Sequence, residues 1–182
     1  MRIIAGKYAN RNLSTKGINR KITRPVQAII RKSVFSKLGD IRGSTVLDLF
    51  CGTGVMGMES LSRGCDYAIF ADRNRHNIKI LHENMQSLNE ENYEAHAVDF
   101  RMALKAMNNN DKQADIIIAD PPHKWVEKFS VLNYISKYNV LAPGGIVIHH
   151  MSRDQSLKQE GFADIDSAVF GRNKFIIFRE EN

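Results

Sequence analysis

The sequence predicts an α/β fold built on one mostly parallel sheet, and two features of the chain lead to this prediction. Short apolar runs rich in Val and Ile alternate with amphipathic stretches from Val46 onward, a pattern typical of βαβ units. The final two runs are separated by residues 170–173, which are too few for a helix and indicate an antiparallel hairpin. We therefore expect helices on both faces of a parallel sheet that closes with a hairpin.

Each expected strand is a short apolar run bounded by glycine or polar residues. The parallel strands are expected at residues 46–50, 67–71, 94–98, 116–119 and 145–149, and the hairpin at 162–169 and 174–179. The stretches between the parallel strands have helical character at residues 57–63, 75–88, 100–107 and 126–140. The sheet is thus expected to contain one helix after each of its first four strands.

The chain before the first strand differs in character. Residues 1–23 set short apolar pieces among Gly, Asn and Lys, which predicts a small hairpin or a loosely ordered arm. Pro25 then suits the first turn of a helix that ends at Gly39, with apolar residues recurring on one face. We divide the chain into a basic N-terminal arm or hairpin, residues 1–24, and one domain, residues 25–182.

Length and composition fit one ordinary globular domain. The 182 residues suffice for a full-size core. No apolar run approaches the ~20 residues that span a bilayer, and the first residues do not resemble a secretory signal. Two cysteines, Cys51 and Cys65, are too few for a disulfide framework or a four-cysteine zinc site. We expect a cytoplasmic protein, a monomer, with no membrane partner.

Positive charge is concentrated at the N-terminus. Residues 1–42 contain eleven Lys and Arg against one acid, Asp40, a net charge of +10 in a chain whose total is +6, so residues 43–182 carry −4. A basic segment on a mildly acidic domain favours a polyanionic partner, most simply nucleic acid. The alternative is a solvated tail that only aids solubility.

A glycine-rich turn follows the first expected parallel strand. Gly52, Gly54 and Gly57 match G-x-G-x-x-G at a strand-to-helix junction, where backbone N–H groups can approach a ligand. Asp72 lies about 20 residues further on, at the end of the next strand, where a carboxylate binds ribose hydroxyls. The pattern predicts a cofactor that contains adenosine; a tight turn without a ligand is the alternative.

Two details favour S-adenosylmethionine over a nicotinamide dinucleotide. Asp48, just before the glycines, would repel a pyrophosphate but can receive the ammonium group of a methionine. Asp99 and Phe100 follow the third strand and can hold an adenine amine and an adenine ring face. Asp99 could also cap the next helix. The expected cofactor site comprises Asp48, Phe50, Cys51, Gly52, Thr53, Gly54, Asp72, Arg73, Asp99 and Phe100.

The fourth strand ends in Asp120-Pro121-Pro122, which predicts a site for an amine. Ligands of open parallel sheets bind beyond the carboxyl ends of the strands, so Asp120 should face the same side as Asp48 and Asp72. The prolines lack N–H groups, which leaves two acceptors, the Asp120 carboxylate and the Pro121 carbonyl. Two acceptors suit the two hydrogens of an exocyclic base amine and direct its lone pair at a sulfonium methyl. Alternatively, the prolines simply end the strand.

These motifs together resemble the RsmD family of bacterial methyltransferases, which methylate N2 of a guanine in 16S rRNA. The similarity covers nearly the whole chain, and Arg2-Ile-Ile-Ala-Gly6 is its most specific marker. The other matching stretches are Leu13, Thr23–Pro25 with Phe35 and Leu38, Val46–Gly54, Glu59–Gly64, Asp120–Pro122, Phe170-Gly171 and Ile177–Arg179. The resemblance implies a Rossmann-like class I methyltransferase fold with a seven-stranded sheet, and an N-terminal extension that contacts RNA.

The resemblance also suggests how the substrate is bound. The family motif usually ends in an aromatic residue that stacks on the flipped base; here His123 stands in that place, and Trp125 could supply a ring. The helix after Pro25 departs too, with Ala28-Ile29 and Lys32 where the family tends to have Asp-Arg and Glu. We expect catalysis by Asp120 and Pro121, and contacts to 16S rRNA or the assembling small subunit from Pro122, His123, Trp125, Arg2, Lys7, Arg11 and Arg24.

Other functions are open to the same residues. A methyltransferase of adenine in DNA or of a protein glutamine shares the Asp-Pro-Pro chemistry, although the basic arm disfavours a protein substrate. A non-catalytic RNA-binding or ribosome-assembly protein could keep the fold. A nicotinamide oxidoreductase lacks an evident acid or base for hydride transfer. No metal is expected, because His149 and His150 are adjacent on a strand and face opposite ways, with His150 towards the cofactor side.

Overall fold

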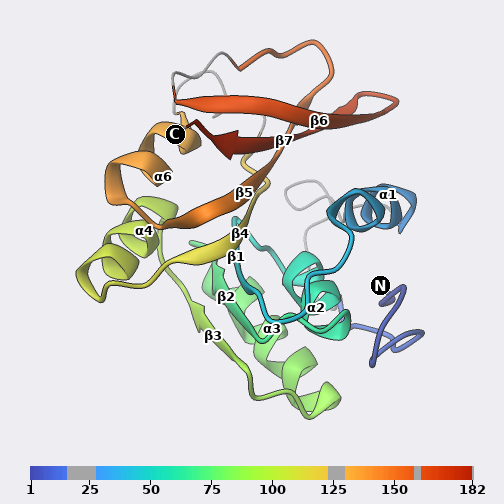
Figure 1. The fold of residues 1–182 in the computed structure, drawn as a ribbon. Helices are drawn as coiled ribbons and strands as arrows, with labels where there is room; N and C mark the ends of the chain where they lie inside the picture. Colours follow the sequence, from blue (N-terminus) through green and yellow to red (C-terminus); the bar gives the residue numbers. More distant parts are fainter. Residues whose placement is uncertain (16–27, 123–129, 158–160, 182) are drawn as a thin grey trace.

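The computed structural model describes residues 1–15, 28–122, 130–157 and 161–181, and these build a single sheet with helices on both faces (Figure 1). The strands described pair in the order β3-β2-β1-β4-β5-β7-β6. Their bounds are β1 (Thr45–Leu49), β2 (Tyr67–Ala71), β3 (Tyr93–His96), β4 (Ala114–Ala119), β5 (Leu141–Ser152), β6 (Phe162–Phe170) and β7 (Asn173–Glu180). The first five strands run parallel, and β7 pairs antiparallel with both β5 and β6.

The helices cover the two faces of the sheet in sets that are also visible in Figure 1. One face is covered by α1 (Ala28–Leu38), α2 (Val55–Ser62) and α3 (Arg75–Leu88), and the other by α4 (Phe100–Asn109) and α6 (Val131–Tyr138). Neighbouring residues of β1 show the separation, since Val46 packs into the first core and Leu47 into the second. Burial on both faces explains why the strands read as continuous apolar runs.

The predicted α/β class, the parallel order and the closing hairpin are confirmed. The bounds of β2 and α3 agree with prediction, while α2 begins at Val55, two residues early, because Gly54 provides its N-terminal boundary. The strand expected at 145–149 is too short: β5 begins at Leu141 because a register shift opposite Ala114 and Ile116 accommodates the extra residues. The expected helix starts at 25 and 126 lie outside the described residues.

Residues 1–15 fold back on themselves, like the hairpin that was one of the two alternatives expected for residues 1–23, and they pack onto the domain. An antiparallel bridge joins Arg2 to Asn12, while Ile3 and Leu13 are 1% and 3% exposed within the core on the α2 side. The remainder of the expected arm, residues 16–24, lies outside the described part of the chain. The basic N-terminal segment is thus part of the hydrophobic core, as well as a carrier of charge.

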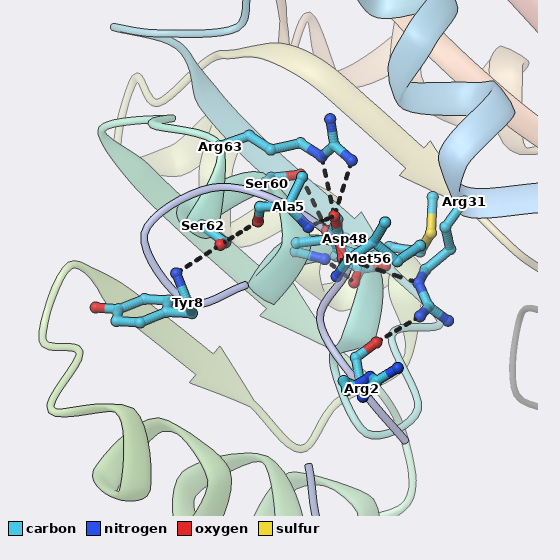
Figure 2. A network of polar contacts seen from close by, with 12 residues as sticks. Arg2, Ala5, Tyr8, Arg31, Asp48, Met56, Ser60, Ser62 and Arg63 are labelled. Atoms are coloured by element: carbon cyan, nitrogen blue, oxygen red, sulfur yellow. Dashed lines mark hydrogen bonds and ion pairs between the residues drawn. The ribbon is translucent and has the colours of Figure 1, made fainter. Parts of the chain in front are cut away.

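A buried carboxylate on α2 anchors this segment (Figure 2). Glu59 is fully buried, and its oxygens accept from the backbone N–H groups of Ile4 and Ala5 at 2.8 and 3.1 Å. Arg63 donates to the same carboxylate at 3.0 Å, and the Arg31 side chain of α1 lies 4.0 Å away. A buried charge is tolerated only when it is paired and hydrogen-bonded in this manner. Glu59 therefore holds the N-terminal segment, α1 and α2 together.

Two basic residues of the segment reach α3 and the loop that follows it. Lys7 Nζ lies 2.7 Å from Glu90, and the Arg11 guanidinium donates to the Ser87 carbonyl at 2.7 Å. Both side chains remain exposed to solvent over much of their length.

In the described residues no helix is both long and apolar enough to cross a bilayer.

The docking of the N-terminal segment can be tested at Gly6. A Cβ at this position would lie 1.7 Å from the backbone oxygen of Ser62, and the residue has a φ of +84°. We expect Gly6→Ala to lower the free energy of unfolding by about 3 kcal/mol or more, because backbone overlap is added to left-handed strain. Urea unfolding, with limited proteolysis at the N-terminus, measures this effect.

Gly43→Ala is the matched control. Gly43 has a similar φ of +79°, but nothing lies within 4 Å of the place that an added Cβ would occupy. It should show only the strain of a left-handed alanine, about 1–2 kcal/mol. Equal losses in the two variants would contradict the view that close packing against α2 fixes the segment.

Candidate active site

Three carboxylates gather at the carboxyl edge of the parallel strands. Asp48 lies in β1, Asp72 follows β2 and Asp120 follows β4, and the register places Leu49 beside both Ala71 and Ala119. Val46 and Ile118 face the side of the sheet covered by α1, α2 and α3. Asp48 and Asp120 each follow one of them by two residues, so they are expected on the same side. The sequence-based expectation that these strand ends meet at one edge agrees with this topology.

The glycine turn after β1 is built from left-handed residues. Phe50, Gly52 and Gly54 have φ values of 60°, 55° and 79°, so the chain reverses within a few residues. The Gly54 N–H donates to the Cys51 carbonyl at 2.8 Å, and the Cys51 N–H donates to the Ala71 carbonyl at 3.1 Å. Cys51 and Thr53 are buried within this turn. The turn is held against the end of β2, next to Asp72.

The third glycine of the motif serves packing. A Cβ on Gly57 would lie 2.2 Å from the ring of Phe70, a fully buried residue of β2. Only glycine lets α2 approach the sheet this closely. The Gly57 N–H also donates to the Asp48 carboxylate at 3.0 Å, so the position of α2 and the position of Asp48 depend on each other.

Asp48 is a buried acid with an unusual protonation state. Burial raises its pKa to about 8, the hydrogen bond from Gly57 opposes this, and the charges of Asp120 and Asp72 add to the rise. The ligand-free protein therefore holds Asp48 largely protonated at neutral pH. A cationic group placed beside it would restore the carboxylate, so this position is suited to an ammonium ligand.

Asp72 organises the turn as well as facing the edge of the sheet. One oxygen accepts from the Gly52 N–H at 2.9 Å and the other from the Asn74 N–H at 2.7 Å. Each carboxylate oxygen has a second lone pair, so these bonds leave acceptor capacity for a ligand hydroxyl. Arg73, the next residue, is exposed.

Asp99 and Phe100 have structural roles at the start of α4. Asp99 is the N-cap, accepting from the Arg101 N–H at 3.1 Å, so the capping alternative is realised. Phe100 is 3% exposed, with its ring 5.0 Å from Phe50 and 5.4 Å from Tyr134. Phe50, half-buried, covers Phe100, and Tyr134 comes from α6. The sequence pattern did not indicate Tyr134, because only the packing of α6 on α4 brings it there.

The end of β4 is linked to the C-terminal hairpin through a histidine. His150 Nδ1 lies 2.5 Å from Asp120 Oδ1, and its Nε2 lies 3.1 Å from Asn173 Oδ1 on β7. The ring stacks on Phe175 with centroids 4.4 Å apart and an interplanar angle of 8°. The prediction that His150 faces the cofactor side is consistent with this contact. The sequence alone did not indicate Asn173 as a site residue, because the register of the hairpin brings it next to His150.

His149 faces the other side of the sheet, as expected from strand alternation. It is 1% exposed, and its Nδ1 has no hydrogen-bond partner in the described structure. Burial and the neighbouring His150 lower its pKa to about 4, although Asp120 acts in the opposite direction. His149 is therefore a neutral core residue. No group of three or more His, Cys, Asp or Glu arranged for a metal ion occurs within the described ranges.

The remaining predicted site residues divide into two sets. Pro121 is buried and Pro122 exposed after β4, while Arg2, Lys7 and Arg11 are exposed on the N-terminal segment. Arg24, His123 and Trp125 fall outside the described residues, so the predictions for them are unchanged. Of the predicted amine site, the structure thus describes Asp120 and Pro121, the two residues expected to supply acceptors, and not the expected stacking residues.

A parallel sheet with a glycine turn after β1, carboxylates at its carboxyl edge and a closing antiparallel hairpin defines the class I methyltransferase fold. The chain belongs to the family described as "Conserved hypothetical protein 95", whose family pattern matches residues 1–179, and this is the RsmD-like family indicated by the motifs. The sequence is 30% identical to "Ribosomal RNA small subunit methyltransferase D" of Buchnera aphidicola, over 78% of this chain and 81% of the relative.

Solved structures share the fold at lower identity. The structure titled "Putative methyltransferase yhhF from Escherichia coli" superposes with a TM-score of 0.85 at 20% identity, covering 100% of this chain and 98% of that one. Another, described as a methyltransferase complexed with SAH, has a TM-score of 0.66 at 19% identity and covers 94% and 52%. These similarities establish the arrangement of the sheet and helices.

The protonation of Asp48 predicts a pH-dependent stability. The native ligand-free protein holds a proton up to a pKa of about 8, whereas the unfolded chain releases it near the ordinary aspartate value of 3.8. The free energy of unfolding should therefore fall as the pH rises from about 4 to about 8. Asp48→Asn removes this titration while its amide oxygen can still accept from Gly57. We expect the variant to gain stability relative to wild type between pH 5 and 8, on the order of 3 kcal/mol.

Urea titrations at several pH values measure this difference. Asp66→Asn, at an exposed carboxylate before β2, is the control and should follow the wild-type pH dependence. If Asp48→Asn and wild type lose stability in parallel, Asp48 is ionised in the native protein and burial does not raise its pKa to about 8.

Proposed function

We propose that this protein transfers a methyl group from S-adenosylmethionine to the exocyclic N2 amine of a guanine in 16S rRNA of the small ribosomal subunit. The observation that carries the proposal is the convergence of Asp120 with Asp48 and Asp72 at one edge of the sheet. The fold is one used by methyltransferases, and a 30% identical relative is named for the small ribosomal subunit. One structure with this fold is complexed with SAH, which is the product left after S-adenosylmethionine gives up its methyl group.

The residues around the glycine turn fit this cofactor. Asp48 is buried and protonated in the absence of a cation, and it would receive the methionine ammonium. Gly52 and Gly54 take the backbone through left-handed conformations beside Asp72, which would accept from the ribose hydroxyls. Asp99, at the start of α4, would face the adenine amine. The ring of Phe50 packs against the buried ring of Phe100 with centroids 5.0 Å apart. The bound cofactor would supply a sulfonium carbon whose bond to sulfur breaks during transfer.

The chain's own contribution to the reaction lies in Asp120 and Pro121. A base amine is a weak nucleophile because its lone pair is delocalised into the ring. The Asp120 carboxylate and the Pro121 carbonyl would accept its two hydrogens, which favours a pyramidal nitrogen and aims its lone pair at the methyl carbon. As the new N–C bond forms, the nitrogen loses one proton, which the Asp120 carboxylate would accept. No covalent enzyme intermediate is required.

The N-terminal segment supports an RNA substrate. Arg2, Lys7 and Arg11 project from a hairpin that is fixed to the domain, so their charges are presented from a rigid base. Phosphate contacts of this kind supply most of the sequence-independent affinity for nucleic acid. Lys7 and Arg11 already contact Glu90 and Ser87, which orients their side chains without neutralising the whole basic segment.

The direct test is a methyl-transfer assay. The protein is incubated with labelled S-adenosylmethionine and small ribosomal subunits that lack the methyl group, and the label on the RNA is measured. We expect wild type to transfer label to guanine N2, and Asp120→Ala to lower kcat by about 100-fold or more, since it removes an acceptor aligned with the amine. Asp66→Ala, at the opposite edge of the sheet, should leave kcat unchanged. The labelled nucleotide is identified by nuclease digestion and mass spectrometry.

The outcomes separate the alternative functions. Label on adenine in DNA, with none on rRNA, would indicate the other nucleic-acid amine methyltransferase. Measurable cofactor binding without transfer to any nucleic acid would indicate a non-catalytic RNA-binding or assembly protein. Running naked 16S rRNA in parallel with assembled particles shows which form the protein accepts.

The basic segment can be tested by removing charge. Deleting it would also remove Ile3 and Leu13 from the core, so substitution separates binding from folding. We expect Arg2→Gln, Lys7→Gln and Arg11→Gln together to weaken RNA binding and to reduce the salt slope by about 0.7–0.9 per lost phosphate contact. Filter binding over a range of salt concentrations measures both quantities, and cofactor affinity should not change.

The matched control carries three Gln substitutions on the opposite face of the sheet. Lys105, Lys112 and Lys137 are exposed, and Lys112 pairs with Glu94 as Lys7 pairs with Glu90. This variant has the same net charge as the test variant. Equal changes of the salt slope in both would mean that overall charge governs RNA binding, and the N-terminal segment would have no specific part in it.

A further inference from the structure

The contact between Asp120 and His150 joins two parts of the chain that are 30 residues apart. The side chains are 30% and 12% exposed, so the pair is partly shielded from water. An aspartate at the end of a strand can rotate about its side-chain bonds, and rotation would misdirect an acceptor that must meet an amine hydrogen. A donor fixed to one carboxylate oxygen removes this freedom.

His150 is itself fixed by the closing hairpin. The strand β7 pairs with β5 so that Phe175 lies opposite His150 and Asn173 opposite Ser152. Phe175 is buried and presents its face to the imidazole, while Asn173 Oδ1 stands at the second ring nitrogen. Stacking sets the plane of the ring, and the amide sets its rotation within that plane. The imidazole therefore has a defined direction towards Asp120.

We propose that His150 is a positioning residue for catalysis, donating from Nδ1 to Asp120 Oδ1 so that the other carboxylate oxygen, Oδ2, is directed at the substrate amine. This inference rests on the proposed function of Asp120. It assigns the closing hairpin a role in the chemistry, because Asn173 and Phe175 hold the histidine that holds the aspartate.

The charges around the ring favour this arrangement. Both ring nitrogens face oxygen acceptors, which is the environment of an imidazolium with two N–H donors. Burial would lower the pKa of His150, but the hydrogen bond and charge of Asp120, with Asn173, raise it overall. Asp120 on β4 is a titratable group that acts on the ring. His150 in turn lowers the pKa of His149, its neighbour on β5.

The same donor counters an electrostatic difficulty of the site. Asp120 shares the carboxyl edge of the sheet with Asp48 and Asp72, and like charges at close range favour protonation of one member. That member is Asp48, where burial acts in the same direction. At the same acidic edge, the His150 donor gives Asp120 Oδ1 a hydrogen-bond partner.

Two substitutions at position 150 separate positioning from folding. His150→Ala removes the donor, and we expect kcat for small-subunit methylation to fall about 10- to 100-fold, with KM and cofactor affinity unchanged. His150→Asn keeps an N–H donor near the place of Nδ1 in a side chain that does not titrate. It should recover most of the lost kcat, and Asn173→Ala should fall between the two. Thermal unfolding identifies any variant that fails to fold.

A second measurement does not depend on catalysis. Histidine NMR signals, with that of His150 assigned by its loss in His150→Asn, should show wild-type His150 titrating above the ordinary histidine pKa of 6.5. Asp120→Asn removes the carboxylate charge and should lower this pKa. The signal of His76, an exposed residue of α3, is the internal reference for comparing the two proteins.

The results distinguish this inference from the proposed function. Wild-type kcat in His150→Ala, or equal losses in the Ala and Asn variants, would contradict the positioning role even in an active enzyme. A His150 titration that is the same with and without the Asp120 charge would contradict the pairing. If wild type transfers no methyl group to any substrate, the proposed function fails and the catalytic role of His150 fails with it, whatever the titration shows.

Discussion

The buried carboxylate of Glu59 is the interaction on which the rest of the structure depends. It binds the backbone of Ile4 and Ala5, pairs with Arg63 and lies beside Arg31 of α1, so three separate segments meet at one charge. Such a charge is stable only while all its partners are in place. Because Glu59 lies two residues beyond Gly57 on α2, the same contacts fix the helix whose N–H binds Asp48. The basic segment and the cofactor turn therefore share one support.

At Glu59 a buried negative charge has positively charged partners, whereas at the carboxyl edge of the sheet three acidic residues lie near one another. Asp48, Asp72 and Asp120 cannot all be ionised without compensation, and the chain compensates each by a different means. Asp48 keeps a proton, Asp72 accepts two backbone N–H groups, and Asp120 contacts His150. The three acids thus differ in their hydrogen-bond partners and in their remaining acceptors. This difference allows one edge to receive an ammonium, hydroxyls and, under the proposed function, a base amine.

The local sequence was sufficient to predict those site residues that lie at strand ends. It was insufficient to predict residues that reach the site through strand register or helix packing. The ends of β1, β2 and β4 were predictable from apolar runs, so Asp48, Asp72 and Asp120 could be assigned to one edge. Asn173 and Tyr134 were missed, because hairpin register and helix packing bring them to the site. The length of β5 was also missed, since its bulge opposite β4 depends on pairing. The backbone partners of Glu59, Ile4 and Ala5, are about 55 residues away, and no local pattern indicates such contacts.

The order of the last strands has a consequence for how the molecule is assembled. Although β7 follows β6 in the chain, it lies between β5 and β6 in the sheet. During synthesis β6 emerges first and lacks its strand partner until β7 has followed it, so β5 is left with an open edge in the meantime. The cofactor turn is complete long before then, whereas the partners of His150 arrive with β7. A nascent chain would therefore acquire its ligand cradle early and its aligned Asp120 among the last steps of folding.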